Sequence, residues 1–139
     1  MRKLFATSST NYSSLILRIS VGIMLFAHGL QKLGVIGDGT PAGIVGFFGS
    51  LGVPAFIAWL VIIAESLGAL SLILGFLTRF CAASLLVVML GAIFLVHLPN
   101  GFFAGANGFE LHFVAIGSLL VLVLTGGGMW SADAIIAKK

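Results

Sequence analysis

The chain has 139 residues, of which 60% are hydrophobic and 8% charged, and its formal net charge is +3. About a quarter of the residues in a soluble domain are charged, so this composition excludes a soluble globular protein and indicates an integral membrane protein. With so much of the chain in lipid, we expect residues 1–139 to form one domain, and no nucleic-acid partner is needed to explain the small excess of positive charge.

Apolar stretches long enough to cross the hydrocarbon core, which takes roughly 20 helical residues, lie near residues 13–33, 54–77, 80–98 and 111–128. The last of these is short unless it continues through the glycines at 126–128. The first stretch is too long for a cleaved signal peptide and carries Arg18, so we expect it to be retained. The sequence therefore predicts an all-α protein, a four-helix bundle integral to the membrane.

Basic residues gather on the side of the bundle that holds both chain ends. These are Arg2, Lys3, Arg79, Lys138 and Lys139, whereas the other side has only Lys32. Because positive charge near spans favours the cytoplasmic side, we expect both termini in the cytoplasm and a multi-pass protein of the bacterial plasma (inner) membrane.

The loop between the first two spans is too apolar to be simply solvated. Thr40-Pro41 is a typical helix start, and apolar residues recur at helical spacing until Gly52. We predict a short helix lying in the outer membrane interface, and the alternative is a hydrophobic linker. The second and third spans are joined by Thr78 and Arg79 alone, so these helices must be antiparallel neighbours.

Ionisable residues inside the spans mark the candidate site, because such groups in hydrocarbon usually serve a ligand or proton path. Arg18, His28 and Lys32 share one face of the first helix within about 80°. Glu65 is the one acidic residue deep inside the hydrophobic runs. Counted from the helix ends, it differs in height by about 7 Å from His28, 8 Å from Arg18 and 13 Å from Lys32. We therefore expect Glu65 to pair with Arg18 or His28, and a purely structural Arg18–Glu65 ion pair is the alternative.

Other polar residues lie nearer the ends of the spans. His97, Glu110 and His112 are expected above Glu65, where they either line a ligand site or simply lie in the headgroup layer. These residues contain no tight metal-ligand motif, so no metal site is expected. At the inner end, Asp133 is placed to form a structural ion pair with Arg79 or Arg18.

In this order and spacing, several short motifs resemble the DoxX family of small four-helix membrane proteins. They are Arg18 with Gly22, the run from Phe26 to Leu33, Gly52-Val53-Pro54, Glu65-Ser66-Leu67-Gly68-Ala69, the run from Gly75 to Arg79, Glu110, the glycines at 126–128, and Ser131-Ala132-Asp133. The resemblance covers most of the chain from Leu15 to Asp133. It implies a membrane subunit of a thiosulfate:quinone oxidoreductase or of a related complex that responds to oxidative or thiol stress.

We expect a membrane redox component that binds a quinone or a similar lipophilic molecule between the helices. Glu65 and His28 would supply protons as acid groups, and the ligand would also meet Arg18, Lys32, His97, Glu110 and His112. The sequence has no flavin, haem or iron–sulfur motif, so electrons would come from a partner oxidoreductase or a bound reductant. The alternatives are a proton or small-solute transporter, for which a homo-oligomer could be needed, and a non-catalytic lipid-binding or assembly subunit.

Overall fold

A computed structural model describes residues 12–138. Each long hydrophobic run forms a helix, and no strand occurs in this part of the chain. The first is α1, Tyr12–Lys32. The second is continuous from Ala55 to Leu74 and consists of α3 (Ala55–Ile63), the π-helical η1 (Ala64–Gly68) and α4 (Ala69–Leu74). The third comprises α5 (Thr78–Ala92), the π-helical η2 (Ile93–His97) and the 3₁₀ turn η3 (Leu98–Asn100).

These three helices are long and apolar enough to cross a membrane, and α6 (Glu110–Thr125) is a shorter apolar helix of 16 residues. The expected all-α membrane bundle is thus confirmed. The extension of the last span through the glycines is wrong, because Gly126 turns to φ 78° and ends α6. Three of the basic residues that predict the orientation, Arg2, Lys3 and Lys139, lie outside the described residues, so the cytoplasmic position of the termini stays a prediction.

The short helix predicted in the first long loop is present as α2 (Pro41–Ser50). The Thr40 hydroxyl accepts a hydrogen bond of 3.0 Å from Gly43 N, and Pro41 follows as the first helical residue. No residue of α2 is buried within the protein, and its position in the outer membrane interface stays a prediction. The second long loop contains the 3₁₀ turn η4 (Ala104–Ala106).

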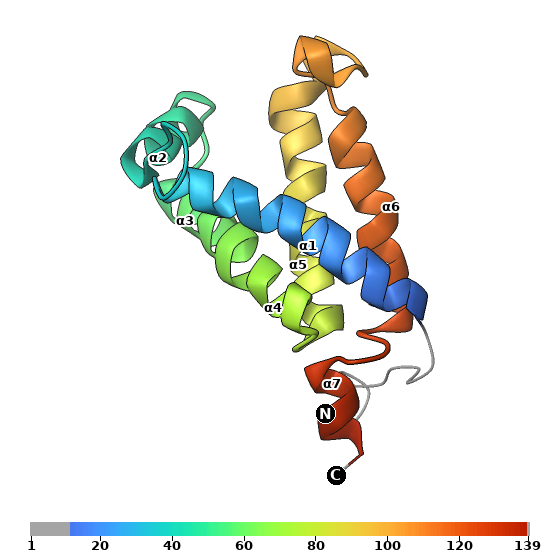
Figure 1. The fold of residues 1–139 in the computed structure, drawn as a ribbon. Coiled ribbons are helices and arrows are strands. Elements are labelled where there is room, and N and C mark those ends of the chain that lie inside the picture. Colours follow the sequence, from blue (N-terminus) through green and yellow to red (C-terminus); the bar gives the residue numbers. More distant parts are fainter. Residues whose placement is uncertain (1–11, 139) are drawn as a thin grey trace.

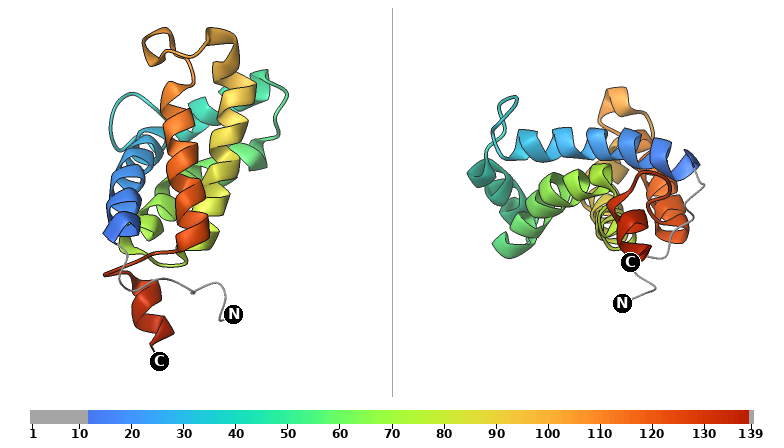
Figure 2. Two further views of the ribbon diagram at one scale, coloured as in Figure 1. Left: turned by 90° about the vertical axis from the view of Figure 1, so that its right-hand side faces the viewer. Right: turned by 60° about the horizontal axis from the view of Figure 1, so that its bottom comes forward.

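The α5 and α6 helices stand side by side, and α1 and the α3–α4 helix are inclined to them (Figures 1 and 2). The helices meet through a core whose largest apolar members are Leu25, Leu72, Leu85, Leu119 and Leu122. The outward faces are just as apolar, as at Val87 and Leu124, whose exposed fractions are 70% and 74%. Such surfaces suit contact with lipid. Beyond α6, the short helix α7 (Ala132–Ala137) projects from one end of the bundle (Figure 1), which we call the C-terminal end.

Among the glycines inside the described helices, Gly29 of α1 has the tightest contact with another helix. A Cβ atom built on Gly29 would lie 2.5 Å from the carbonyl carbon and oxygen of Glu65. The two backbones therefore touch without an intervening side chain, as is common where small residues lie between membrane helices. This contact sets the position of Glu65 relative to α1.

Candidate functional site

The centre of the candidate site is an ion pair between Lys32 of α1 and Glu65 of η1. Lys32 Nζ donates to Glu65 Oε2, and the two side chains are 21% and 5% exposed. The prediction that Glu65 pairs with Arg18 or His28 is therefore wrong. The prediction compared heights along parallel helices whose outer ends lie at the same level. In the structure α1 is inclined (Figure 1), and Gly29 lies against the Glu65 backbone. Lys32 lies three residues further along the same face, and its long side chain reaches back.

Two π-helical segments carry ionisable residues of the site. Glu65 lies in η1 and His97 lies in η2. A π-helical turn shifts the side chains that follow it around the helix axis, and such turns occur frequently at functional sites. The α-helical period of 3.6 residues per turn does not reveal π-helical turns in a sequence. This is one reason why the predicted partner of Glu65 was wrong.

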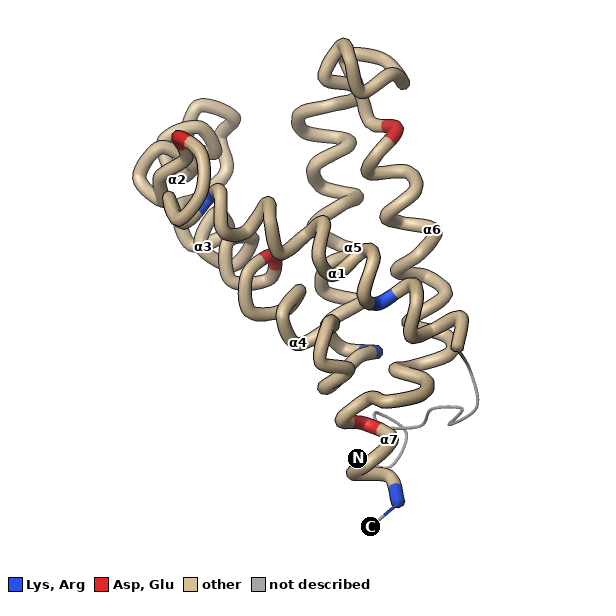
Figure 3. Tube along the Cα trace, viewed as in Figure 1, with Lys and Arg blue, Asp and Glu red and all other residues tan. Residues whose placement is uncertain are grey.

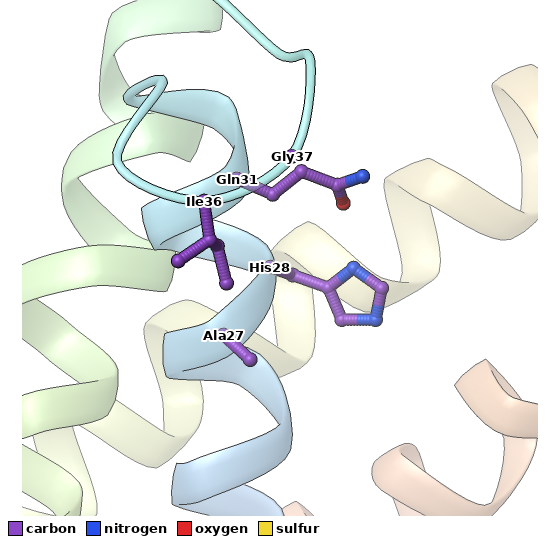
Figure 4. A pocket seen from close by; sticks show the side chains of 5 residues that line it. All are labelled: Ala27, His28, Gln31, Ile36 and Gly37. Atoms are coloured by element: carbon purple, nitrogen blue, oxygen red, sulfur yellow. The ribbon is translucent and has the colours of Figure 1, made fainter.

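His28 lines a hollow of about 220 Å³ beside α1. Its other lining residues are Ala27 and Gln31 of α1 and Ile36 and Gly37 of the following loop. Figure 4 shows the His28 and Gln31 side chains pointing out from α1 on the same side. The lining is mainly apolar and has two polar side chains, His28 and Gln31, as a site for a small amphipathic molecule requires.

Two further imidazoles lie near His28. The rings of His97 and His112 are 4.1 Å apart between centroids and tilted by 35°. His97 Nδ1 lies 2.8 Å from the carbonyl oxygen of Asn107. Because that oxygen can only accept, Nδ1 carries the proton and a neutral His97 keeps Nε2 as an acceptor.

His112 links this pair to α1. His28 and Lys32 are close enough to His112 to interact with its charge. The Nδ1 atom of His112 is buried and has no hydrogen-bond partner within residues 12–138. Buried polar atoms of this kind usually have a partner, so Nδ1 of His112 is a position where a ligand or water would gain a bond. We call His28, Lys32, Glu65, His97 and His112 the polar cluster.

Glu110, also predicted here, begins α6 two residues before His112 and is half-buried. In the described part of the chain, no group of three or more His, Cys, Asp or Glu side chains is arranged to hold a metal ion. Charged residues are sparse along the helices (Figure 3), and Lys32 and Glu65 are two of these few.

Arg18 does not belong to the polar cluster. It lies ten residues before His28 on α1, about 15 Å along the helix. Its side chain is 1% exposed and donates to three backbone carbonyls, those of Ile73 at 2.8 Å, Met129 at 3.0 Å and Trp130 at 2.6 Å. The sequence could indicate that a buried guanidinium needs acceptors, but it could not name carbonyls at the ends of other elements.

Asp133 and Arg79 also bind backbone groups at the C-terminal end. Asp133 accepts from Leu77 N at 2.8 Å and Thr78 N at 2.9 Å, and so caps the start of α5. It is close enough to Arg18 for their charges to interact. Arg79 donates to the carbonyl of Val123 at 2.9 Å. The ion pair between Arg79 and Asp133 stays a prediction.

Comparison with known protein families matches residues 13–98 to DoxX. A Bacillus subtilis (strain 168) protein named "Putative oxidoreductase CatD" is 30% identical over 130 residues, which cover 94% of this chain and 91% of that protein. The "Inner membrane protein YqjF" of Escherichia coli (strain K12) is 33% identical over 127 residues, 90% of this chain and 92% of the relative. A membrane protein of Mycobacterium tuberculosis is 32% identical over 140 aligned residues, 91% of this chain and 83% of the relative. No solved structure matches the chain.

Proposed function

Because the chain belongs to the DoxX family, we propose that it is a multi-pass redox component of the bacterial inner membrane that binds a quinone or similar lipophilic molecule. The observation that carries the proposal is the hollow lined by His28. His28 and Lys32, the partner of Glu65, are both close enough to His112, whose Nδ1 has no partner in the described residues, to interact with its charge. The names of the relatives from Bacillus subtilis and Escherichia coli, an oxidoreductase and an inner membrane protein, agree with this class.

The chemistry of quinone reduction suits these residues. Each carbonyl oxygen that gains electrons must also gain a proton, and a positioned imidazole or carboxyl group is the usual acid. His28 is exposed at the hollow and would meet the ligand directly. Glu65 is a carboxylate while it accepts from Lys32, so it would first take up a proton and then pass it toward His28, and Lys32 would balance the carboxylate charge between these steps. Electrons would come from a partner oxidoreductase or directly from a bound reductant, because the sequence contains no flavin, haem or iron–sulfur motif.

The test is equilibrium binding of a short-chain quinone to the purified protein in lipid nanodiscs. We expect saturable binding by the wild type, and binding at least tenfold weaker in His28→Ala and Glu65→Gln, a loss of about 1.4 kcal/mol. Lys138→Gln, at the C-terminal end, is the matched control and should bind as the wild type does. A wild type without saturable binding would refute the proposal, and so would variants that bind with unchanged affinity.

Transport is the second candidate, because polar groups follow one another toward the buried Glu65. The His97 ring contacts His112, His112 is close enough to Lys32 to interact with its charge, and Lys32 pairs with Glu65. Groups of this kind can pass protons as well as bind a ligand. Flux measured in liposomes with an imposed proton gradient separates the two functions. A flux that Glu65→Gln abolishes, in a protein without quinone affinity, would replace the redox proposal by transport.

A further inference from the structure

A second hollow lies at the C-terminal end of the bundle, far from the polar cluster. Its volume is about 650 Å³, and its lining includes Leu74, Trp130, Ile135 and Lys138. Leu74 ends one of the membrane-length helices, and the next begins at Thr78. The groove therefore lies where the helices leave the hydrocarbon and the chain enters the headgroup layer. Figures 1 and 2 show α7, which forms one wall, standing clear of the bundle.

Trp130 adopts an unusual backbone conformation in this groove. Its φ is 51°, in the left-handed region, and its side chain is 77% exposed. A bulky residue in this region is strained, at a cost of about 1–2 kcal/mol, and the strain persists only where surrounding contacts impose it. An exposed indole gains nothing from the protein interior, so its placement needs another reason.

The contacts that impose the conformation start at Arg18. Its guanidinium holds the carbonyls of both Met129 and Trp130. On the following side, Ser131 Oγ donates to Gly128 O at 2.8 Å and Asp133 N donates to Gly75 O at 2.9 Å. The backbone on each side of Trp130 is thus fixed, and the indole is directed outward.

The exposed side chains here combine an apolar wall with a cation. Leu74 is 60% exposed and Ile135 is 65% exposed, and the exposed Lys138 also lines the groove. Tryptophan is enriched at the membrane–water boundary, and each basic residue near the surface attracts anionic lipid by about 1 kcal/mol. A second copy of the chain docked symmetrically through this face would bring two Lys138 side chains toward one another. Charge therefore favours a lipid over a self-association.

We propose that this groove binds a phospholipid with an anionic headgroup, taken from the leaflet at the C-terminal end. The acyl chain lies against Leu74, Trp130 and Ile135, and the headgroup phosphate meets Lys138. Arg18 acts as a positioning residue, because it holds the backbone that presents Trp130 and does not touch the lipid. This inference is independent of the redox function proposed above.

The chain has two tryptophans, Trp59 and Trp130, which makes a direct measurement available. Trp59→Phe leaves Trp130 as the reporter, and the protein is reconstituted into bilayers containing brominated phosphatidylglycerol or brominated phosphatidylcholine. Quenching by the bromine atoms gives the relative affinity of the two lipids at the indole. We expect phosphatidylglycerol to be preferred about fivefold at Trp130, the equivalent of about 1 kcal/mol for one basic residue.

Matched variants define the outcomes. Lys138→Gln in the same background should abolish the preference, and Trp130→Phe, which leaves Trp59 as reporter, should show none. Arg18→Lys in the Trp59→Phe background should remove the preference at Trp130, while the same substitution in the Trp130→Phe background should leave the Trp59 signal that of a folded protein. Equal quenching by the two lipids at Trp130, or a preference that survives Lys138→Gln, would overturn the proposal. So would a Trp130 that neither brominated lipid quenches, since a protein surface would then cover the groove.

Discussion

Gly29 controls how closely α1 approaches the segment that carries Glu65, so Gly29→Ala should weaken the bundle at the polar cluster. The new methyl group would lie 2.5 Å from the carbonyl carbon and oxygen of Glu65 and 2.6 Å from Ser66 N, whereas ordinary contact begins at 3.4 Å. These are backbone atoms and cannot rotate away, so the helices must separate by roughly 1 Å. Overpacking of this kind costs about 1–3 kcal/mol, and the better helix propensity of alanine returns up to about 1 kcal/mol. We expect a net loss of about 1–2 kcal/mol.

Gly117→Ala and Gly91→Ala are the controls. Both glycines lie inside helices, in α6 and α5, and an added Cβ would meet no heavy atom within 4 Å. These variants should be neutral or more stable by up to about 1 kcal/mol. The free energy of unfolding is measured by circular dichroism in mixed micelles with increasing sodium dodecyl sulfate. A Gly29→Ala protein as stable as the Gly117→Ala protein would refute the close contact between α1 and η1.

The same unfolding assay tests three other contacts. Glu65→Ala should cost about 2–3 kcal/mol, less than the 3–5 kcal/mol typical when a fully buried pair is broken, because Lys32 is 21% exposed. Replacing the pair by Lys32→Met with Glu65→Leu should restore most of that stability, since apolar residues of similar volume often substitute for a buried ion pair. Arg18→Lys should cost about 2 kcal/mol, because one ammonium cannot reproduce the planar fork that reaches three carbonyls. Asp133→Asn should cost about 1 kcal/mol, because the amide oxygen can serve only one of the two backbone N–H groups that begin α5.

The helices were predictable because their signals are local. Hydrophobic length alone places α1 and the helix from Ala55 to Leu74 close to the predicted spans. The start of α2 was likewise predictable, because the hydroxyl of Thr40 and the missing N–H of Pro41 act within one turn. The end of α6 was not, since glycine is common both inside membrane helices and at their ends, and only the φ of 78° at Gly126 decides between them.

The site was less predictable because it depends on how helices cross. The sequence indicated that Glu65 needs a partner, and it placed Lys32 on the correct face of α1. It could not give the inclination of α1 or the π-helical turn at η1, and both change which side chain reaches the carboxylate. Gly29 was the residue that could have predicted this contact. A glycine between His28 and Lys32 on the inward face of α1 indicates where the backbone of a neighbouring helix comes close.

The two ends of the bundle differ in how far their polar groups are already bonded. At the C-terminal end, Arg18 and Asp133 are held by backbone carbonyls and amides, so changing either one alters the fold itself. At the other end, His28 is exposed and His112 Nδ1 has no partner within the described residues. Substitution of an exposed side chain usually changes stability by no more than about 0.5 kcal/mol. A loss of ligand binding in His28→Ala would therefore report on binding, whereas the same loss in an Arg18 variant would first have to be separated from unfolding.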